Sequence, residues 1–243
     1  MPTSIRICCP TNIHHRMDFG LYLLFLIPPL VIGLGVQWWL KRTFARYSNV
    51  PLSSGLIGAR VAREVLDRNG LEAVPVEESP GGALSDHYDP RKRALYLSQP
   101  VYEPATVAAA AVAAHESGHA LQHQAGYVPL SIRSRIFPVV AIASSTWIWL
   151  LLAGALLGAL NLVAVALALY SVAVAFHLVT LPVEFNASRR ASQQLASLGL
   201  VTTAEREGVN KVLTAAALTY VAGALAALSQ LLYYLLIFFG NRD

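Results

Sequence analysis

The sequence predicts a mainly α-helical integral membrane protein in which four transmembrane helices carry a small α+β domain. The 243 residues are 55% hydrophobic and only 13% charged, and the mean hydropathy is +0.50. A chain this apolar is unusual for a soluble domain. The apolar residues gather in blocks separated by charged segments, which is the pattern of spans and loops. Four blocks are long enough to cross the ~30 Å of hydrocarbon in a bilayer.

Residues 1–18 are expected to be a disordered N-terminal extension. The segment is polar and shows no periodicity, and Met17 precedes the first apolar run, so either Met1 or Met17 is a candidate start. Both cysteines of the chain, Cys8 and Cys9, lie here. The rest of the chain therefore has no thiol for a disulfide framework or a cysteine zinc site. Any metal must be bound by histidine and carboxylate.

Residues 19–40 form the first predicted span. Its apolar run carries no charge and ends in two tryptophans followed at once by Lys41, which is an aromatic anchor at a membrane surface. Pro28 and Pro29 are expected to kink the helix or break it locally. The alternative is a cleavable signal peptide, but the run is long and no small-x-small cleavage site precedes Lys41.

The next apolar stretch predicts a helical hairpin. No charged residue lies between Ile136 and Val183, and one helix of this length would reach about 72 Å, more than twice the hydrocarbon thickness. The stretch must fold back, and its most polar and flexible point is residues 158–161. The second and third spans are therefore predicted over 136–158 and 162–182.

The fourth span is predicted over 213–239, after a capping box that begins at Thr202. Four spans leave segments 41–135 and 183–212 on one face of the membrane. All 18 Lys and Arg residues lie on that face except Arg6, Arg16 and Arg242. The positive-inside rule then predicts that segment 41–135 lies in the cytoplasm. The expected location is the inner (plasma) membrane. The net charge of +4 follows from this topology, and no motif indicates nucleic-acid binding.

The 41–135 segment is too small for an independent core and is expected to pack against the membrane helices and segment 183–212. Apolar spacing predicts a helix over residues 54–69. Residues 74–76 and 94–97 are predicted as strands. The second of these is expected to have an exposed edge that binds an extended substrate by strand addition.

An Ala-rich helix predicted over about residues 104–124 contains His115-Glu116-Ser117-Gly118-His119, an HExxH motif. Histidines four apart project from one face of a helix, so both can bind one zinc ion. Glu116 is placed to reach a water beside the metal. The alternative is a set of polar residues on a helix surface, but the apolar run before the motif indicates a packed helix.

A catalytic zinc ion needs a third protein ligand. His123 lies about 12 Å along the helix axis from His115 and cannot share the ion; it is predicted to be a helix-surface or substrate-side residue. Glu184 is the strongest candidate, because the chain crosses the membrane twice after His119 and returns to the same face. The alternative for Glu184 is an interfacial ion pair with Arg189 or Arg190.

Four segments carry a resemblance to a known family: SDHYDPRKRALYLS (85–98), AAHESGHALQH (113–123), GYVPLSIRS (126–134) and LPVEFNASRRA (181–191). With these segments the chain resembles the YugP-like neutral zinc metallopeptidases of bacterial membranes, and the likeness covers nearly everything from Met17 onward. The resemblance implies a gluzincin-like zinc-peptidase domain with His115, His119 and Glu184 on the metal and Glu116 in catalysis. HtpX-like proteases, a more distant likeness, have an aspartate four residues after the glutamate ligand, where this chain has Ser188; Ser188 or Asn186 is then expected to support a ligand histidine.

The predicted function is hydrolysis of peptide bonds by zinc-activated water with Glu116 as general base. The bilayer and a polypeptide, membrane proteins included, are the expected partners; the sequence does not indicate an oligomeric state. The alternative function is a non-catalytic zinc-binding membrane scaffold or chaperone. The transition state also needs a donor for its oxyanion, and the sequence leaves four candidates open: His123, Tyr127, His87 and Arg189.

Overall fold

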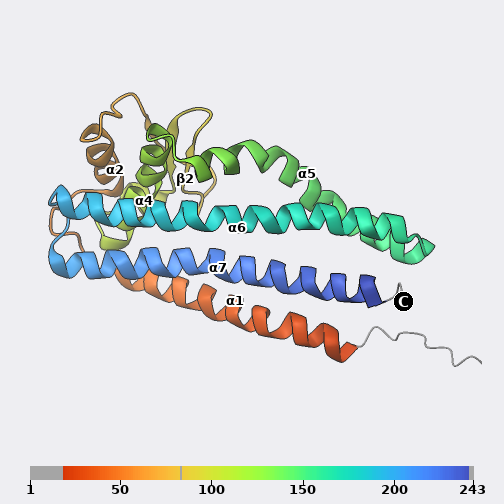
Figure 1. The fold of residues 1–243 in the computed structure, drawn as a ribbon. Helices are drawn as coiled ribbons and strands as arrows, with labels where there is room; N and C mark the ends of the chain where they lie inside the picture. Colours follow the sequence, from red (N-terminus) through yellow and green to blue (C-terminus); the bar gives the residue numbers. More distant parts are fainter. Residues whose placement is uncertain (1–18, 83, 241–243) are drawn as a thin grey trace, which may run out of the picture.

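Four long helices form an elongated bundle in the computed structural model, which describes residues 19–82 and 84–240. They are α1 (Phe19–Tyr47), α5 (Val128–Leu157), α6 (Leu160–Ser197) and α7 (Thr203–Gly240). Within the described residues, these four are long and apolar enough to cross a membrane. Helix α6 packs on α5 and α7, and α1 packs on α7 (Figure 1). The predictions for residues 1–18, including Cys8 and Cys9, lie outside the described part of the chain.

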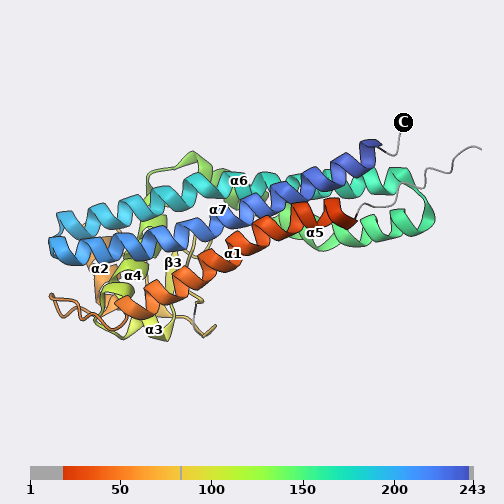
Figure 2. The same ribbon diagram turned by 90° about the horizontal axis from the view of Figure 1, so that it is seen from below.

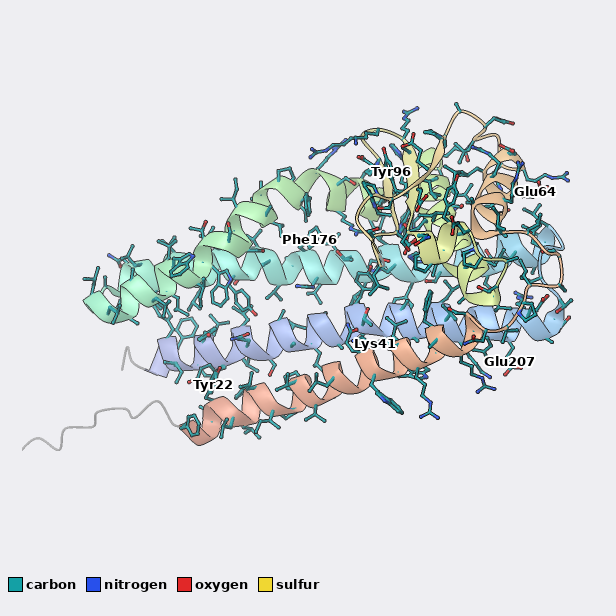
Figure 3. The ribbon with its side chains drawn as sticks, turned by 180° about the vertical axis from the view of Figure 1, so that it is seen from behind. Tyr22, Lys41, Glu64, Tyr96, Phe176 and Glu207 are labelled. Carbon is teal, nitrogen blue, oxygen red and sulfur yellow. The ribbon has the colours of Figure 1, made fainter. Side chains whose placement is uncertain are left out.

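The shorter elements gather at one end of the bundle, where α6 ends and α7 begins (Figures 1 and 2). They are α2 (Gly58–Asp67), β1 (Val76–Glu78), β2 (His87–Asp89), β3 (Ala94–Leu97), α3 (Gln99–Tyr102) and α4 (Val107–Gln124). Figure 3 shows side chains with nitrogen and oxygen crowded at this end, around Tyr96 and Glu64, and few near Tyr22 and Phe176. The molecule thus separates a polar end from an apolar bundle.

The three strands form one sheet in the order β1-β3-β2, with β3 parallel to β1 and antiparallel to β2. The prediction that strand 94–97 has a free edge is therefore wrong, because β3 is paired on both sides. Strand β2 is an edge strand instead. The sequence analysis missed it because the strand is only three residues long and runs directly into the Asp89-Pro90 turn.

The long helices extend beyond the predicted spans. Helices α6 and α7 have 38 residues each, a length of about 57 Å, so each can cross the hydrocarbon and continue well beyond it. Helix α5 ends at Leu157 and is followed by Gly158, whose φ of +62° favours glycine, and α6 begins at Leu160. The hairpin turn thus has only two residues. Helix α1 continues through Pro28 and Pro29 without a local break.

The extensions of α6 and α7 supply the core of the small domain. One cluster joins Val65 of α2 and Ala111 of α4 to Leu195 of α6 and Val209 of α7. A second cluster packs the other side of α4 against the sheet, through residues such as Leu95. Helix α4 is therefore buried on both sides, which explains its Ala-rich sequence: small side chains let several elements approach it closely.

Candidate metal centre

Helix α4 and helix α6 bring three potential metal ligands together. The His115 and His119 rings lie one turn apart on α4, with centroids 4.8 Å apart in an edge-to-face arrangement. Glu184 of α6 places its Oε2 atom 3.2 Å from His115 Nε2 and 3.7 Å from His119 Nε2. The Glu184 side chain is only 1% exposed. One ligand atom from each residue lies within 4.8 Å of the others.

Gly118, inside the motif, allows the two helices to approach so closely. A Cβ atom at this position would lie 2.7 Å from the backbone oxygen of Ala187 on α6, well inside van der Waals contact. Ala187 is itself fully buried and lies three residues after Glu184. The contact between Gly118 and Ala187 therefore sets the distance between the motif and the Glu184 carboxylate.

The donor set and its spacing fit zinc. Two imidazole nitrogens and a carboxylate oxygen are the ligands of one common class of catalytic zinc site, with bonds of about 2.0–2.2 Å. Donor atoms around a tetrahedral ion at such bond lengths lie about 3.3–3.5 Å apart. The two nitrogen–oxygen distances of 3.2 and 3.7 Å bracket that value.

Each histidine has a polar partner on the nitrogen that faces away from Glu184. Ser188 Oγ lies 3.2 Å from His115 Nδ1, and Gln122 Oε1 lies 3.0 Å from His119 Nδ1. A proton on each Nδ1 satisfies both contacts and leaves each Nε2 lone pair free for a metal. The sequence analysis considered Ser188 for such a role, but not Gln122.

Gln122 also ties the motif helix to α6. Its Nε2 donates to the Val183 backbone oxygen at 2.8 Å and to Asn186 Oδ1 at 3.0 Å. Asn186 accepts a further hydrogen bond from Arg190 Nε at 2.8 Å. Asn186, the other support residue considered from the sequence, therefore acts on His119 only through Gln122.

Glu184 pairs with an arginine that the sequence analysis did not connect to it. Arg133, near the start of α5, places its Nη1 atom 2.8 Å from Glu184 Oε1. The sequence alternative was a pair with Arg189 or Arg190, and the structure gives neither. Arg133 was visible in the sequence only as a charge near the end of a span. Its partner depends on how α5 folds back over α4.

Glu116 is buried beside the three potential ligands, with 8% of the residue exposed. Burial raises the pKa of the Glu116 carboxyl to about 7, although the charge of His115 lowers it. A carboxyl with a pKa near neutrality can both accept and return a proton at physiological pH. Asp86 contributes a further negative charge nearby.

Glu116, His119 and Glu184 line a cavity of about 450 Å³. The cavity also reaches His87 of β2 and Tyr220 of α7. Tyr220 lies in a predicted span and outside every motif, so nothing in the sequence indicated that it lines the site. The cavity is thus bordered by the edge strand on one side and by the helical bundle on the other.

The four oxyanion candidates lie in different places, and His87 is the one that lines this cavity. The ring of His123 reaches Tyr88, with Nδ1 2.9 Å from the tyrosine hydroxyl. The Tyr127 hydroxyl donates to the Pro182 backbone oxygen at 3.4 Å. Arg189 lines a separate cavity between α6 and α7.

Comparisons with known proteins indicate zinc as the metal. Residues 22–239 match the family described as "Putative neutral zinc metallopeptidase". The chain is 51% identical over 223 residues to the "Putative membrane protease YugP" of Bacillus subtilis (strain 168), an alignment that covers 92% of this chain and 99% of that protein. No solved structure gives a significant match.

Proposed function

Because the chain belongs to the neutral zinc metallopeptidase family, we propose that it is a membrane-embedded peptidase that uses zinc and Glu116 to hydrolyse peptide bonds. The observation that supports this best is the convergence of His115, His119 and Glu184 at a cavity that His119 and Glu184 line together with Glu116. Glu116 is close enough that the charges of His115 and Glu184 shift the pKa of its carboxyl. A buried acid beside three metal donors is the arrangement that water activation requires.

In the proposed reaction His115, His119 and Glu184 would hold the zinc ion. Zinc, when bound, polarises the substrate carbonyl and lowers the pKa of water. Glu116 accepts a proton from the attacking water, whose oxygen bonds to the carbonyl carbon. The C–N bond then breaks, and Glu116 returns the proton to the leaving amine. Arg133 holds the second oxygen of Glu184, which keeps the other oxygen directed at the histidines.

Two side chains that line the cavity are proposed to stabilise the oxyanion. His87 was a candidate from the sequence, and Tyr220 is added by the structure. Each can donate a hydrogen bond to negative charge that develops on the carbonyl oxygen. The remaining sequence candidates lie outside the cavity lining, and Arg133 is already bonded to Glu184.

The proposed substrate is an extended polypeptide segment close to the membrane surface. Strand β2 borders the cavity and has a free edge, which an extended chain can pair with through backbone hydrogen bonds. Leu130 and Phe137 of α5 give the cavity an apolar wall, and Phe137 lies at the start of the second predicted span. The arginine and lysine distribution supports a cytoplasmic position for this end of the molecule.

Glu116→Gln tests the proposal because it keeps the size of the side chain and removes the base. Both the variant and the wild type are purified in detergent, and zinc content and cleavage of an unfolded protein are measured. We expect equal zinc content and at least 100-fold slower cleavage, since general acid–base catalysis contributes roughly 10²–10⁴-fold. Glu64→Gln, which removes a partly exposed carboxylate of α2 that pairs with Arg68, is the matched control and should cleave normally.

The same experiment separates the peptidase from the alternative, a zinc-binding membrane scaffold or chaperone. A scaffold predicts no zinc-dependent cleavage by the wild type, or the same cleavage by both proteins. Structural zinc sites usually have four protein ligands, whereas three converge here among the described residues. Removal of zinc with a chelator should abolish cleavage, and added zinc should restore it in the wild type alone.

A further inference from the structure

A second cavity, of about 360 Å³, lies between α6 and α7 and is separate from the cavity at the candidate metal centre. Two arginines line it, Arg189 from α6 and Arg206 from α7, and no carboxylate does. Hydroxyl and amide side chains add hydrogen-bonding groups, among them Ser192 and Asn210. Ser192 accepts a hydrogen bond from Arg206 at 3.4 Å. The part of the cavity around the two arginines is therefore polar and positively charged.

The cavity changes from polar to apolar in the direction of the membrane. Phe185 and Leu213 also line it, and they lie next to the predicted ends of the third and fourth spans. At 1.5 Å per helical residue, Arg189 lies about 6 Å beyond Phe185 and Arg206 about 10 Å beyond Leu213, away from the membrane. The two arginines therefore lie at the level of lipid headgroups, and the apolar lining lies at the start of the hydrocarbon.

An apolar surface continues from the cavity along both helices. Leu178, two turns before Phe185 on α6, is 43% exposed, and Leu225 on α7 is 42% exposed. The groove thus offers arginines to an anion and leucines to a hydrocarbon chain. An inorganic anion would use only the first of these features, whereas a phospholipid would use both.

We propose that this cavity binds the headgroup of an anionic phospholipid, with Arg189 and Arg206 on the phosphate and the acyl chains along α6 and α7. Planar guanidinium groups bind phosphate through paired hydrogen bonds. Basic pockets between membrane helices on the cytoplasmic side are suited to acidic lipids. Ser188 lines the cavity and also contacts His115, so the lipid site lies directly behind the metal cluster. The proposal depends on insertion in a membrane but not on peptidase activity.

Native mass spectrometry of the full chain in mild detergent tests the site directly. Phosphatidylglycerol and phosphatidylcholine with the same acyl chains are titrated against the wild type and the Arg189→Gln/Arg206→Gln variant. Each arginine near an anionic headgroup contributes roughly fivefold in affinity. The double variant should therefore bind phosphatidylglycerol roughly 25-fold more weakly, with little change for phosphatidylcholine.

Arg42→Gln/Arg46→Gln is the matched control, because it removes the same charge from the cytoplasmic end of α1. These arginines lie over the rings of Trp38 and Tyr47 rather than in the cavity. The control should keep the wild-type preference for phosphatidylglycerol. Thr214→Trp, a third variant, leaves every arginine in place but fills the cavity, and should lose the preference.

Three results would overturn the lipid site. The first is that the double variant keeps its preference for phosphatidylglycerol. The second is that the α1 control loses as much affinity as the double variant. The third is that the cavity-filling variant binds like the wild type. A competition arm separates a lipid from free phosphate: if millimolar inorganic phosphate displaces phosphatidylglycerol from the wild type, the assignment to a lipid is wrong. The assay measures the mass of bound lipid, so its result does not depend on whether the protein has peptidase activity.

Discussion

Replacement of Gly118 by alanine should weaken the metal site although it touches no ligand. The added Cβ atom would lie 2.7 Å from the backbone oxygen of Ala187, and ordinary contact begins at 3.4 Å. Helices α4 and α6 would have to separate by about 0.7 Å, since the atom they collide with belongs to the backbone and cannot rotate away. Glu184 lies on the helix that moves, while the histidines lie on the helix that carries the substitution.

A separation of this size is a third of a zinc–ligand bond length of about 2.0–2.1 Å. Displacement of the groups that position zinc ligands typically costs 10–100-fold in metal affinity, and we expect a loss in this range for Gly118→Ala. Overpacking destabilises the fold by about 1–3 kcal/mol. The higher helix propensity of alanine offsets up to about 1 kcal/mol of this loss.

Zinc affinity is measured by competition with a chromophoric chelator, and thermal unfolding is followed in the same detergent. Gly35→Ala in α1 is the matched control, because a Cβ atom there has nothing within 4 Å. It should leave zinc affinity unchanged and should not lower the unfolding temperature. Wild-type zinc affinity in Gly118→Ala would show that the close approach of α4 and α6 does not set the metal geometry, and would refute the reasoning.

Three further predictions concern the support of the site. Arg133→Gln removes the cation paired with the buried Glu184 carboxylate and should lower zinc affinity about tenfold in the same titration. Arg135→Gln, at an exposed position, should have no effect. Ser188→Ala removes the Nδ1 partner of the first motif histidine and should also cost about tenfold, whereas Ser171→Ala, whose hydroxyl bonds within its own helix, should cost nothing. Leu195→Ala opens a cavity in the fully buried core and should destabilise the fold by about 2–5 kcal/mol in denaturant unfolding. An unchanged midpoint would show that α6 does not carry the core of the small domain.

These effects share one origin, which is the double role of α6. Its first part is apolar and long enough to lie in a membrane, and its second part supplies both Glu184 and the buried Leu195 of the domain core. The helix continues through Pro182, so the two parts form one continuous helix. A change in how α6 packs in the bundle is therefore expected to reach the proposed metal ligands directly.

The sequence alone determined the features that depend on short segments. Long uncharged runs gave four helices that can span a membrane, and a four-residue spacing placed His115 and His119 on one helical face. Counting the crossings between His119 and Glu184 was enough to expect both on the same side. Hydropathy and helical periodicity are local properties, because they follow from the solvation and backbone geometry of a few neighbouring residues.

Only the tertiary structure decided which side chains meet across long separations. It paired Glu184 with Arg133 rather than Arg189 or Arg190. It also made β2 one of the two edge strands of the sheet and placed the strand at 94–97 in the middle. It also added Tyr220 to the cavity. These contacts depend on how each helix is rotated and how closely it packs, and the sequence spacing fixes neither. Packing of whole helices sets both, through contacts such as Gly118 on Ala187.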